Sequence, residues 1–260
     1  GQPHALVLES TYGDRTHQRS DPENAFRAAI RRTFDRGGSV IIPAFALGRT
    51  QEVLYHLSQL VDDGELDPND VFLDSPMAIK ATDIYDQAKA EHDDDLKELV
   101  EQHLNPLAPD RFARCRSAEQ SKALNDRREP AVIVAASGMA TGGRVVHHLK
   151  HRLGDERTSV IFVGYQAAGT RGRALVDGSP MVAIHGDPIA VQAEIRQLHG
   201  LSAHADRAEL LRWVEALPGS PERIFLNHGE DPPRKTLAAA LHREGLVRPQ
   251  LPANGESVPW

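Results

Sequence analysis

The sequence of residues 198–230 is LHGLSAHADRAELLRWVEALPGSPERIFLNHGE, and it brings two histidines to the ends of predicted elements. A polar turn, SAHAD at 202–206, precedes leucines and a valine at helical spacing, which predicts a helix directly after His204. An apolar run at 224–226 predicts a buried strand, and this strand stops at the Asn-His-Gly motif that contains His228. Functional side chains concentrate in loops at such ends. The stretch therefore predicts a site that contains both histidines.

The rest of the chain alternates predicted strands and helices. Strands are predicted at 5–9, 39–45, 71–74, 131–135 and 159–163, and helices at 22–36, 47–60, 79–104 and 143–153. Such alternation predicts an α/β fold with a parallel sheet flanked by helices. The turn signal Gly186-Asp187-Pro188 predicts a hairpin, at which we expect the chain to leave one domain for another.

Three ordered motifs resemble signatures of the β-CASP branch of the metallo-β-lactamase superfamily. This branch contains nucleases such as the mRNA 3′-end cleavage endonuclease and ribonuclease J. The first motif is Leu6-Val-Leu-Glu9-Ser-Thr-Tyr-Gly-Asp-Arg15, and the others are SAHAD and NHG. The similarity continues through IPAFALGRTQ, LDSPMA, ASGMATGGR and FVGYQ, so it covers nearly the whole chain.

The resemblance implies an architecture of two domains. In the family, a parallel α/β cassette is inserted into an αββα metallo-β-lactamase domain, and the substrate lies between the two. We therefore expect a β-CASP domain at 10–191. Residues 1–9 and 192–260 would be a strand and the C-terminal part of the metallo-β-lactamase domain.

The family's HxHxDH signature, which supplies most of the metal ligands, does not occur in this sequence. The resemblance thus implies the C-terminal part of a zinc-dependent ribonuclease that holds two zinc ions when intact. We expect the zinc site of this chain to be incomplete and the chain alone to be inactive. Strands without their sheet neighbours would expose apolar edges, which suggests a homodimer.

By resemblance, the catalytic residues are Glu9 and His204. Glu9 would hold the imidazole of His204 so that its other nitrogen faces the scissile phosphate as a proton donor. His228 would be a metal ligand or a phosphate contact, and a histidine at this motif is typical of the RNA-processing members of the family. Ser202, in the turn before His204, is expected to contact the substrate.

A glycine-rich turn, Ser137-Gly-Met-Ala-Thr-Gly-Gly143, lies between a predicted strand and a predicted helix. Such a turn can present backbone N–H groups to a phosphate. We therefore predict an RNA-backbone site whose residues are Arg49, Ser137, Gly138, Gly142, Gly143 and Arg144. The histidines at 147, 148 and 151 include an i, i+4 pair, but without a third ligand they predict an exposed helix face.

Composition limits the remaining possibilities. The net charge is −7, so RNA binding must come from a local patch rather than from overall charge. The single cysteine, Cys115, excludes a disulfide framework and suits a reducing compartment. No apolar run approaches the ~20 residues of a membrane span. The sequence predicts a cytoplasmic protein that does not associate with membranes.

Two alternatives remain open. One is a non-catalytic RNA-binding or scaffold relative with a degraded metal site, although the presence of Glu9, His204 and His228 together argues against it. The other is a serine hydrolase that uses Ser137 with His204. The sequence around Ser137 lacks the first glycine of the GxSxG motif, which disfavours this alternative.

Overall fold

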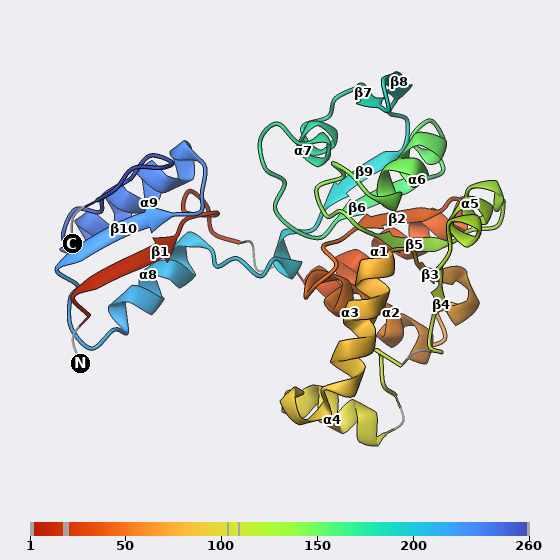
Figure 1. Cartoon of the computed structure of the whole chain (residues 1–260), viewed down its shortest axis with the longest axis horizontal. Helices are drawn as coiled ribbons and strands as arrows, with labels where there is room; N and C mark the ends of the chain where they lie inside the picture. The colour runs from red at the N-terminus through yellow and green to blue at the C-terminus, as the bar shows by residue number, and fades with distance from the viewer. Residues whose placement is uncertain (1–2, 18–20, 103, 109, 259–260) are drawn as a thin grey trace. The chain divides into compact units, whose positions relative to one another are not determined.

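The structure is a computed structural model that describes residues 3–17, 21–102, 104–108 and 110–258. The chain forms two compact units (Figure 1). Residues 1–19 and 202–260 form one, called here the terminal unit, and residues 20–201 form the other, the central unit. The chain thus begins in the terminal unit, passes through the central unit and returns.

The central unit is built on a six-stranded parallel sheet with the order β4-β3-β5-β2-β6-β9. The strands are β2 (Val40–Pro43), β3 (Val71–Leu73), β4 (Ala113–Arg114), β5 (Val132–Ala135), β6 (Ser159–Phe162) and β9 (Glu194–Gln197). The helices are α1 (Pro22–Asp35), α2 (Arg49–Asp62), α3 (Pro76–Gln87), α4 (Asp94–Glu101), α5 (Ala118–Asp126), α6 (Arg144–Arg152) and α7 (Arg171–Val176). The 3₁₀ helices are η1 (Pro68–Asp70), η2 (Lys89–Glu91) and η3 (His199–Leu201), and a hairpin pairs β7 (Met181–Ile184) with β8 (Asp187–Ala190).

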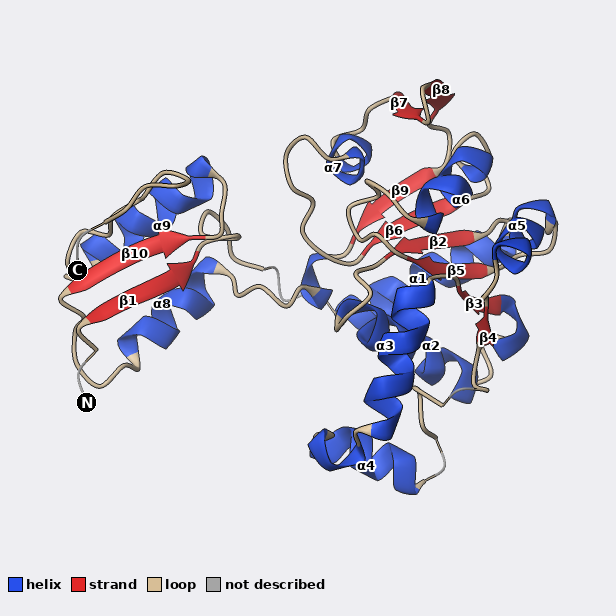
Figure 2. Cartoon of the chain, in the orientation of Figure 1, coloured by secondary structure: helices blue, strands red, loops and turns tan. Residues whose placement is uncertain are grey.

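Helices cover both faces of this sheet (Figure 2). Every residue of β2, β5 and β6 is buried, as expected for central parallel strands. One core packs α1, α2 and α3 against one face, and a second core packs α5, α6 and α7 against the other. The predicted α/β class with a helix-flanked parallel sheet is confirmed.

The terminal unit contains β1 (Ala5–Glu9), β10 (Arg223–Asn227), α8 (Arg207–Glu215) and α9 (Asp231–Arg243). The two strands are parallel, with Leu6 beside Ile224 and Leu8 beside Leu226. These side chains form one core with α8 and α9, so both helices pack on the same face. On the other face Val7 is 60% exposed. The C-terminal segment 252–258 and that face line a cavity of about 400 Å³.

The units divide at other positions than the predicted domain boundaries of 9/10 and 191/192. The reason at the second boundary is β9, which pairs with β6 and so extends the central sheet. The predicted hairpin is formed by β7 and β8, but the chain stays in the central unit until Leu201. At the first boundary, residues after β1 remain with the terminal unit because Tyr12 bridges to Asp206.

The region 79–104 was predicted to be helical, and the structure divides it into separate helices. The structure has two helices, α3 and α4, and the side chain of Asp93 caps the second by accepting from Leu96 N at 2.9 Å. α5, α7 and α9 were not predicted from the sequence. Within the described ranges, none of the helices combines the length and the apolar character needed to span a lipid bilayer.

Candidate active site

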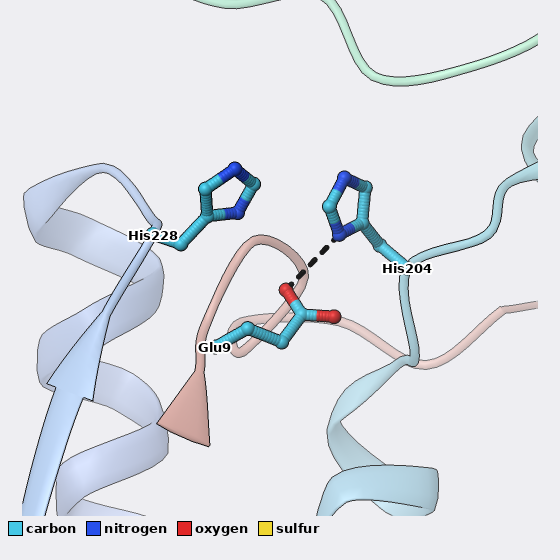
Figure 3. Close-up of side chains that lie close together, drawn as sticks. All are labelled: Glu9, His204 and His228. Atoms are coloured by element: carbon cyan, nitrogen blue, oxygen red, sulfur yellow. Dashed lines mark ion pairs between the residues drawn. The ribbon is translucent and has the colours of Figure 1, made fainter. Parts of the chain in front are cut away.

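Three predicted residues meet at one end of the terminal unit. Glu9 ends β1, His228 follows β10 directly, and His204 lies in the turn before α8. Parallel pairing places Glu9 beside Asn227, which brings His228 close to Glu9. Candidate ligand atoms of Glu9, His204 and His228 all lie within 4.8 Å of one another (Figure 3). The predicted convergence of these residues is confirmed, and the distance from Glu9 Oε2 to His204 Nδ1 is 3.2 Å.

The carboxylate of Glu9 is held by surrounding donors. Oε2 accepts from the backbone N–H of Thr11 at 3.0 Å, and Oε1 accepts from that of Ala205 at 3.2 Å. Burial alone would raise the pKa of Glu9. The hydrogen bonds from Thr11 and the neighbouring His204 outweigh burial, so the pKa is lowered from its ordinary value. Glu9 is therefore a carboxylate anion at neutral pH that can only accept hydrogen bonds.

The two imidazoles lie side by side. The rings of His204 and His228 are stacked, with centroids 5.1 Å apart and planes inclined by 28°. Figure 3 shows that both rings turn Nδ1 toward Glu9 and Nε2 away from it. The ring of His204 also meets the edge of the buried Tyr12 ring at 6.3 Å. The site therefore presents two Nε2 atoms in the same direction.

A fourth residue of the site, Thr11, was missed by the sequence analysis. Its side chain is buried, and Oγ1 lies 3.2 Å from Nδ1 of His228 and 3.4 Å from Nδ1 of His204. The same hydroxyl donates to the carbonyl oxygen of His228 at 3.0 Å. The only available signal was its place two residues after Glu9 in the first motif.

The backbone of the NHG motif has an unusual conformation. His228 has a φ of 49°, in the left-handed region that few residues other than glycine adopt. Its N–H donates to Oδ1 of Asn227 at 2.8 Å. Gly229 follows with its Cα against Ser10, where an added Cβ would come within 2.4 Å of the hydroxyl oxygen. The motif thus combines a short hydrogen-bond acceptor at Asn227, a left-handed backbone at His228 and a glycine at 229.

Asp206 fixes the turn that carries His204. It is the N-cap of α8 and forms a capping box with Glu209. Its other oxygen accepts from the backbone N–H of His17 at 2.7 Å, which ties the loop after β1 to this turn. His17, Asp206 and Glu209 also lie within metal-binding distance of one another, but the carboxylates already accept these backbone bonds. Ser202 Oγ accepts from His204 N at 3.3 Å, so the structure places Ser202 inside the same turn.

The predicted glycine-rich turn lies at the carboxyl end of β5 in the central unit. Ser137 Oγ accepts from the N–H groups of Thr141 and Gly142, at 3.2 and 3.3 Å. Gly143 has a φ of 75° and precedes α6 with no side-chain cap, and Gly142 has open space around its Cα. Gly138 lies against the ring of Phe45, which is 48% exposed. The hydroxyl of Ser137 has no histidine among its described partners, so the structure gives no support to a serine hydrolase.

The arginines predicted for RNA binding have partners within the central unit. Arg144 donates to Asp74 Oδ1 at 2.6 Å and to the carbonyl oxygen of Cys115 at 2.7 Å. Arg49 pairs with Glu52 at the start of α2. Both side chains are largely buried. Arg144 connects the segments that follow β3 and β4, whereas Arg49 makes its contact within α2.

The prediction of an exposed helix face was wrong for His148. His147 and His151 are exposed, but His148 is fully buried because it lies on the side of α6 that packs on the sheet. Its Nε2 lies 2.6 Å from Oδ2 of Asp74, and its Nδ1 lies 2.9 Å from Asn125. Asp74 is therefore the centre of a buried polar network that the sequence analysis did not find.

The donor set of the terminal unit fits part of a zinc site. Zinc in catalytic sites takes three protein ligands and keeps one position open. His228 offers Nε2, which points away from the hydrogen-bonded side of the ring. Glu9 uses both oxygens for N–H donors, and His204 uses Nδ1 for Glu9. Within the described residues, His228 is thus the member of this group best suited to bind a metal.

Comparison with known proteins agrees with this geometry. Residues 50–175 match the Beta-Casp domain, and residues 188–252 match the Zn-dependent metallo-hydrolase RNA specificity domain. Ribonuclease TTHA0252 of Thermus thermophilus is 36% identical over 255 residues, which are 98% of this chain and 58% of that protein. The RNase J-like protein of Methanocaldococcus jannaschii is 32% identical over 257 residues, again 98% and 58%.

Transcription termination factor FttA of Pyrococcus abyssi is 36% identical over 262 residues, which are 97% of this chain and 40% of that factor. The chain thus spans between 40% and 58% of the length of these three relatives. With both domain matches in the expected order and Glu9, His204 and His228 together in space, the chain belongs to the β-CASP branch of the metallo-β-lactamase superfamily.

Proposed function

We propose that this chain supplies the proton-donating part of the active site of a zinc-dependent RNA nuclease. The observation that carries the proposal is the Glu9–His204 pair, 3.2 Å apart, with His228 stacked on the same imidazole. A histidine that donates Nδ1–H to a carboxylate keeps its other nitrogen available for proton transfer. The zinc-dependent RNA specificity domain match at 188–252 contains both histidines, which supports RNA as the substrate.

In this proposal, His204 is the general acid. Water attacks the phosphorus of a phosphodiester, and the bond from phosphorus to the leaving ribose oxygen breaks. Nε2 of protonated His204 gives its proton to that oxygen, and the proton that the attacking water loses passes to solvent. Glu9 orients the ring and stabilises its positive charge. A positioned general acid contributes about 10²–10⁴-fold to such a rate. Zinc, held in part by Nε2 of His228, would supply Lewis-acid activation of the phosphate and of water.

RNA binding is proposed for the glycine-rich turn of the central unit. The arginines nearby are already paired, and most of the first N–H groups of α2 and α6 donate to preceding carbonyl oxygens, so the contribution would come mainly from the positive ends of the two helix dipoles. Neither helix has a side-chain cap at its N-terminus, and the two helices follow the adjacent strands β2 and β5. The helix dipole at such an end favours an anion such as an RNA phosphate.

The chain alone is proposed to bind zinc weakly and to cleave RNA poorly. Its described residues offer one well-suited ligand, His228, where a catalytic zinc site needs three. In the full-length protein, further ligands would complete the site. Several relatives are named transcription termination factor FttA. A more specific form of the same proposal is therefore action on transcripts during termination.

The test separates the roles of the two histidines in the full-length protein. His204→Ala should reduce cleavage of a labelled RNA by at least about 10²-fold while zinc content stays unchanged, because a proton donor is not a ligand. His228→Ala should lower both cleavage and zinc content. His151→Ala, on the exposed face of α6, is the control and should change neither. Equal zinc loss in the first two variants would contradict the assignment.

A further inference from the structure

The side chain of Thr11 joins the two imidazoles of the site, and it does so through their Nδ1 atoms. Oγ1 lies 3.2 Å from Nδ1 of His228 and 3.4 Å from Nδ1 of His204. Thr11 is 3% exposed, so water does not compete freely for these contacts. The positions of the protons in this group therefore follow from counting donors and acceptors.

A threonine hydroxyl has one proton and two lone pairs. The proton of Thr11 goes to the carbonyl oxygen of His228, which at 3.0 Å is nearer than either Nδ1 and can only accept, whereas a ring nitrogen can also donate. That oxygen has one other described donor, the N–H of Ser10, at a longer 3.4 Å. With its proton used, Oγ1 can only accept from Nδ1 of His228. This ring nitrogen must then carry the hydrogen.

The same reasoning holds for His204 with a different acceptor. The ionised Glu9 carboxylate has no proton to donate, so Nδ1 of His204 must carry the hydrogen at 3.2 Å. Glu9 and Thr11 thus orient one imidazole each. The difference is that Glu9 adds a negative charge beside His204, whereas the hydroxyl beside His228 is neutral.

We propose that Thr11 is a positioning residue that holds His228 in the Nδ1–H tautomer, leaving the Nε2 lone pair free to bind zinc. The identity of the metal rests on the proposed function. The tautomer of His228, in contrast, is a property of this chain alone. A neutral imidazole has one bare nitrogen, and in the opposite tautomer Nε2 would carry a hydrogen and could not be a ligand. Partners of this kind around metal-binding histidines change metal affinity by about 10–100-fold.

The test is the ring-nitrogen NMR spectrum of the 260-residue chain with ¹⁵N-labelled histidine, without metal. It should be recorded near pH 8, above the ordinary histidine pKa of about 6.5. Long-range ¹H–¹⁵N correlations distinguish a ring N–H from a bare ring nitrogen. His204→Gln and His228→Gln identify the two spin systems. In the unmodified chain, His228 should have Nδ1–H and a bare Nε2. Nε2–H as its main form would overturn the proposal.

Two substitutions of Thr11 isolate the hydroxyl. Thr11→Ser keeps it and should preserve the tautomer of His228, whereas Thr11→Val keeps the shape and should shift His228 toward Nε2–H. His204, held by Glu9, should keep Nδ1–H in both. An unchanged His228 in folded Thr11→Val would overturn the proposal; if this variant does not fold, the spectra of the unmodified chain and Thr11→Ser still decide.

A second measurement brings in the metal. In the full-length protein, competition with a chromogenic chelator should show zinc affinity lowered about 10–100-fold by Thr11→Val and nearly unchanged by Thr11→Ser. Unchanged affinity in Thr11→Val would overturn the link between tautomer and metal. Failure of the proposed function would give a different result from failure of the Thr11 proposal. RNA cleavage would then survive His204→Ala, whatever the tautomer of His228.

Discussion

At the scale of single residues, the two acidic groups Glu9 and Asp74 show how burial and hydrogen bonding compete. Burial raises the pKa of Asp74, but hydrogen bonds from His148, Ser121 and Arg144 outweigh it, so the pKa lies below its ordinary value. Glu9 behaves in the same way with Thr11 and His204 as partners. In each unit, hydrogen bonds thus keep a carboxylate ionised although burial alone would favour its protonated form.

Replacing Asp74 by Asn should destabilise the central unit by about 3–5 kcal/mol, because Arg144 loses its buried counter-charge. The stabilisation from a lowered carboxyl pKa is present above the unfolded value of about 3.9 and is lost as pH falls through the folded pKa. Urea unfolding at pH 7 and at several acidic pH values measures both effects. Asp187→Asn, which removes the exposed partner of Lys150, is the control and should change little. Equal effects of the two variants would contradict this account.

At the scale of elements, the connection between α8 and the active site is the capping residue Asp206. Asp206→Ala should destabilise the terminal unit by about 1–2 kcal/mol through the lost cap, and it also removes the tie to His17. Because this turn carries His204, cleavage by the full-length protein should fall as well. Asp93→Ala removes the cap of α4 in the central unit and should leave cleavage intact. Thermal unfolding and RNA cleavage of both variants test the difference.

The elements predicted well are those whose pattern is local. β2, β5 and β6 are short apolar runs buried on both faces, and Asp21-Pro22 marks the start of α1. β9 was missed because Glu-Ile-Arg-Gln is a polar edge strand that only its pairing with β6 defines. α9 was missed because it begins at Asp231-Pro-Pro, which as sequence resembles a loop.

The same contrast holds for the site. The pattern of element ends indicated His204 and His228, but the family motifs were needed to join Glu9 to them, because nothing local relates the ends of the chain. Thr11 and the network around Asp74 are defined by contacts between distant positions, such as the 217 residues that separate Thr11 from His228. A single sequence does not predict such contacts, because they form only when the strands that carry the residues pair in the fold.

At the scale of the whole molecule, the terminal unit carries an apolar surface that the described residues leave partly open. Val7 is 60% exposed, and β1 pairs with β10 on one side only. Unpaired strand edges promote association. We expect the 260-residue chain to dimerise with increasing concentration, and Val7→Lys to weaken the dimer. Ile84→Lys, at an exposed apolar position of α3, controls for general surface charge. Sedimentation velocity over a concentration series measures the dimer fraction of each variant. Equal effects of Val7→Lys and Ile84→Lys would place the interface elsewhere.

The parallel pairing of β1 with β10 also has a consequence for synthesis on the ribosome. The leucines of β1 are translated before the central unit, and their neighbours in the sheet, Ile224 and Leu226, come only after it. At about 5–20 residues per second, roughly 10–40 s pass between the two strands. During that time the central unit can fold, while β1 is still without β10, the strand that it pairs with among the described residues. A codon or sequence change that slows translation between residues 20 and 201 would lengthen this interval and expose β1 to chaperones or proteases without altering any contact of the finished protein.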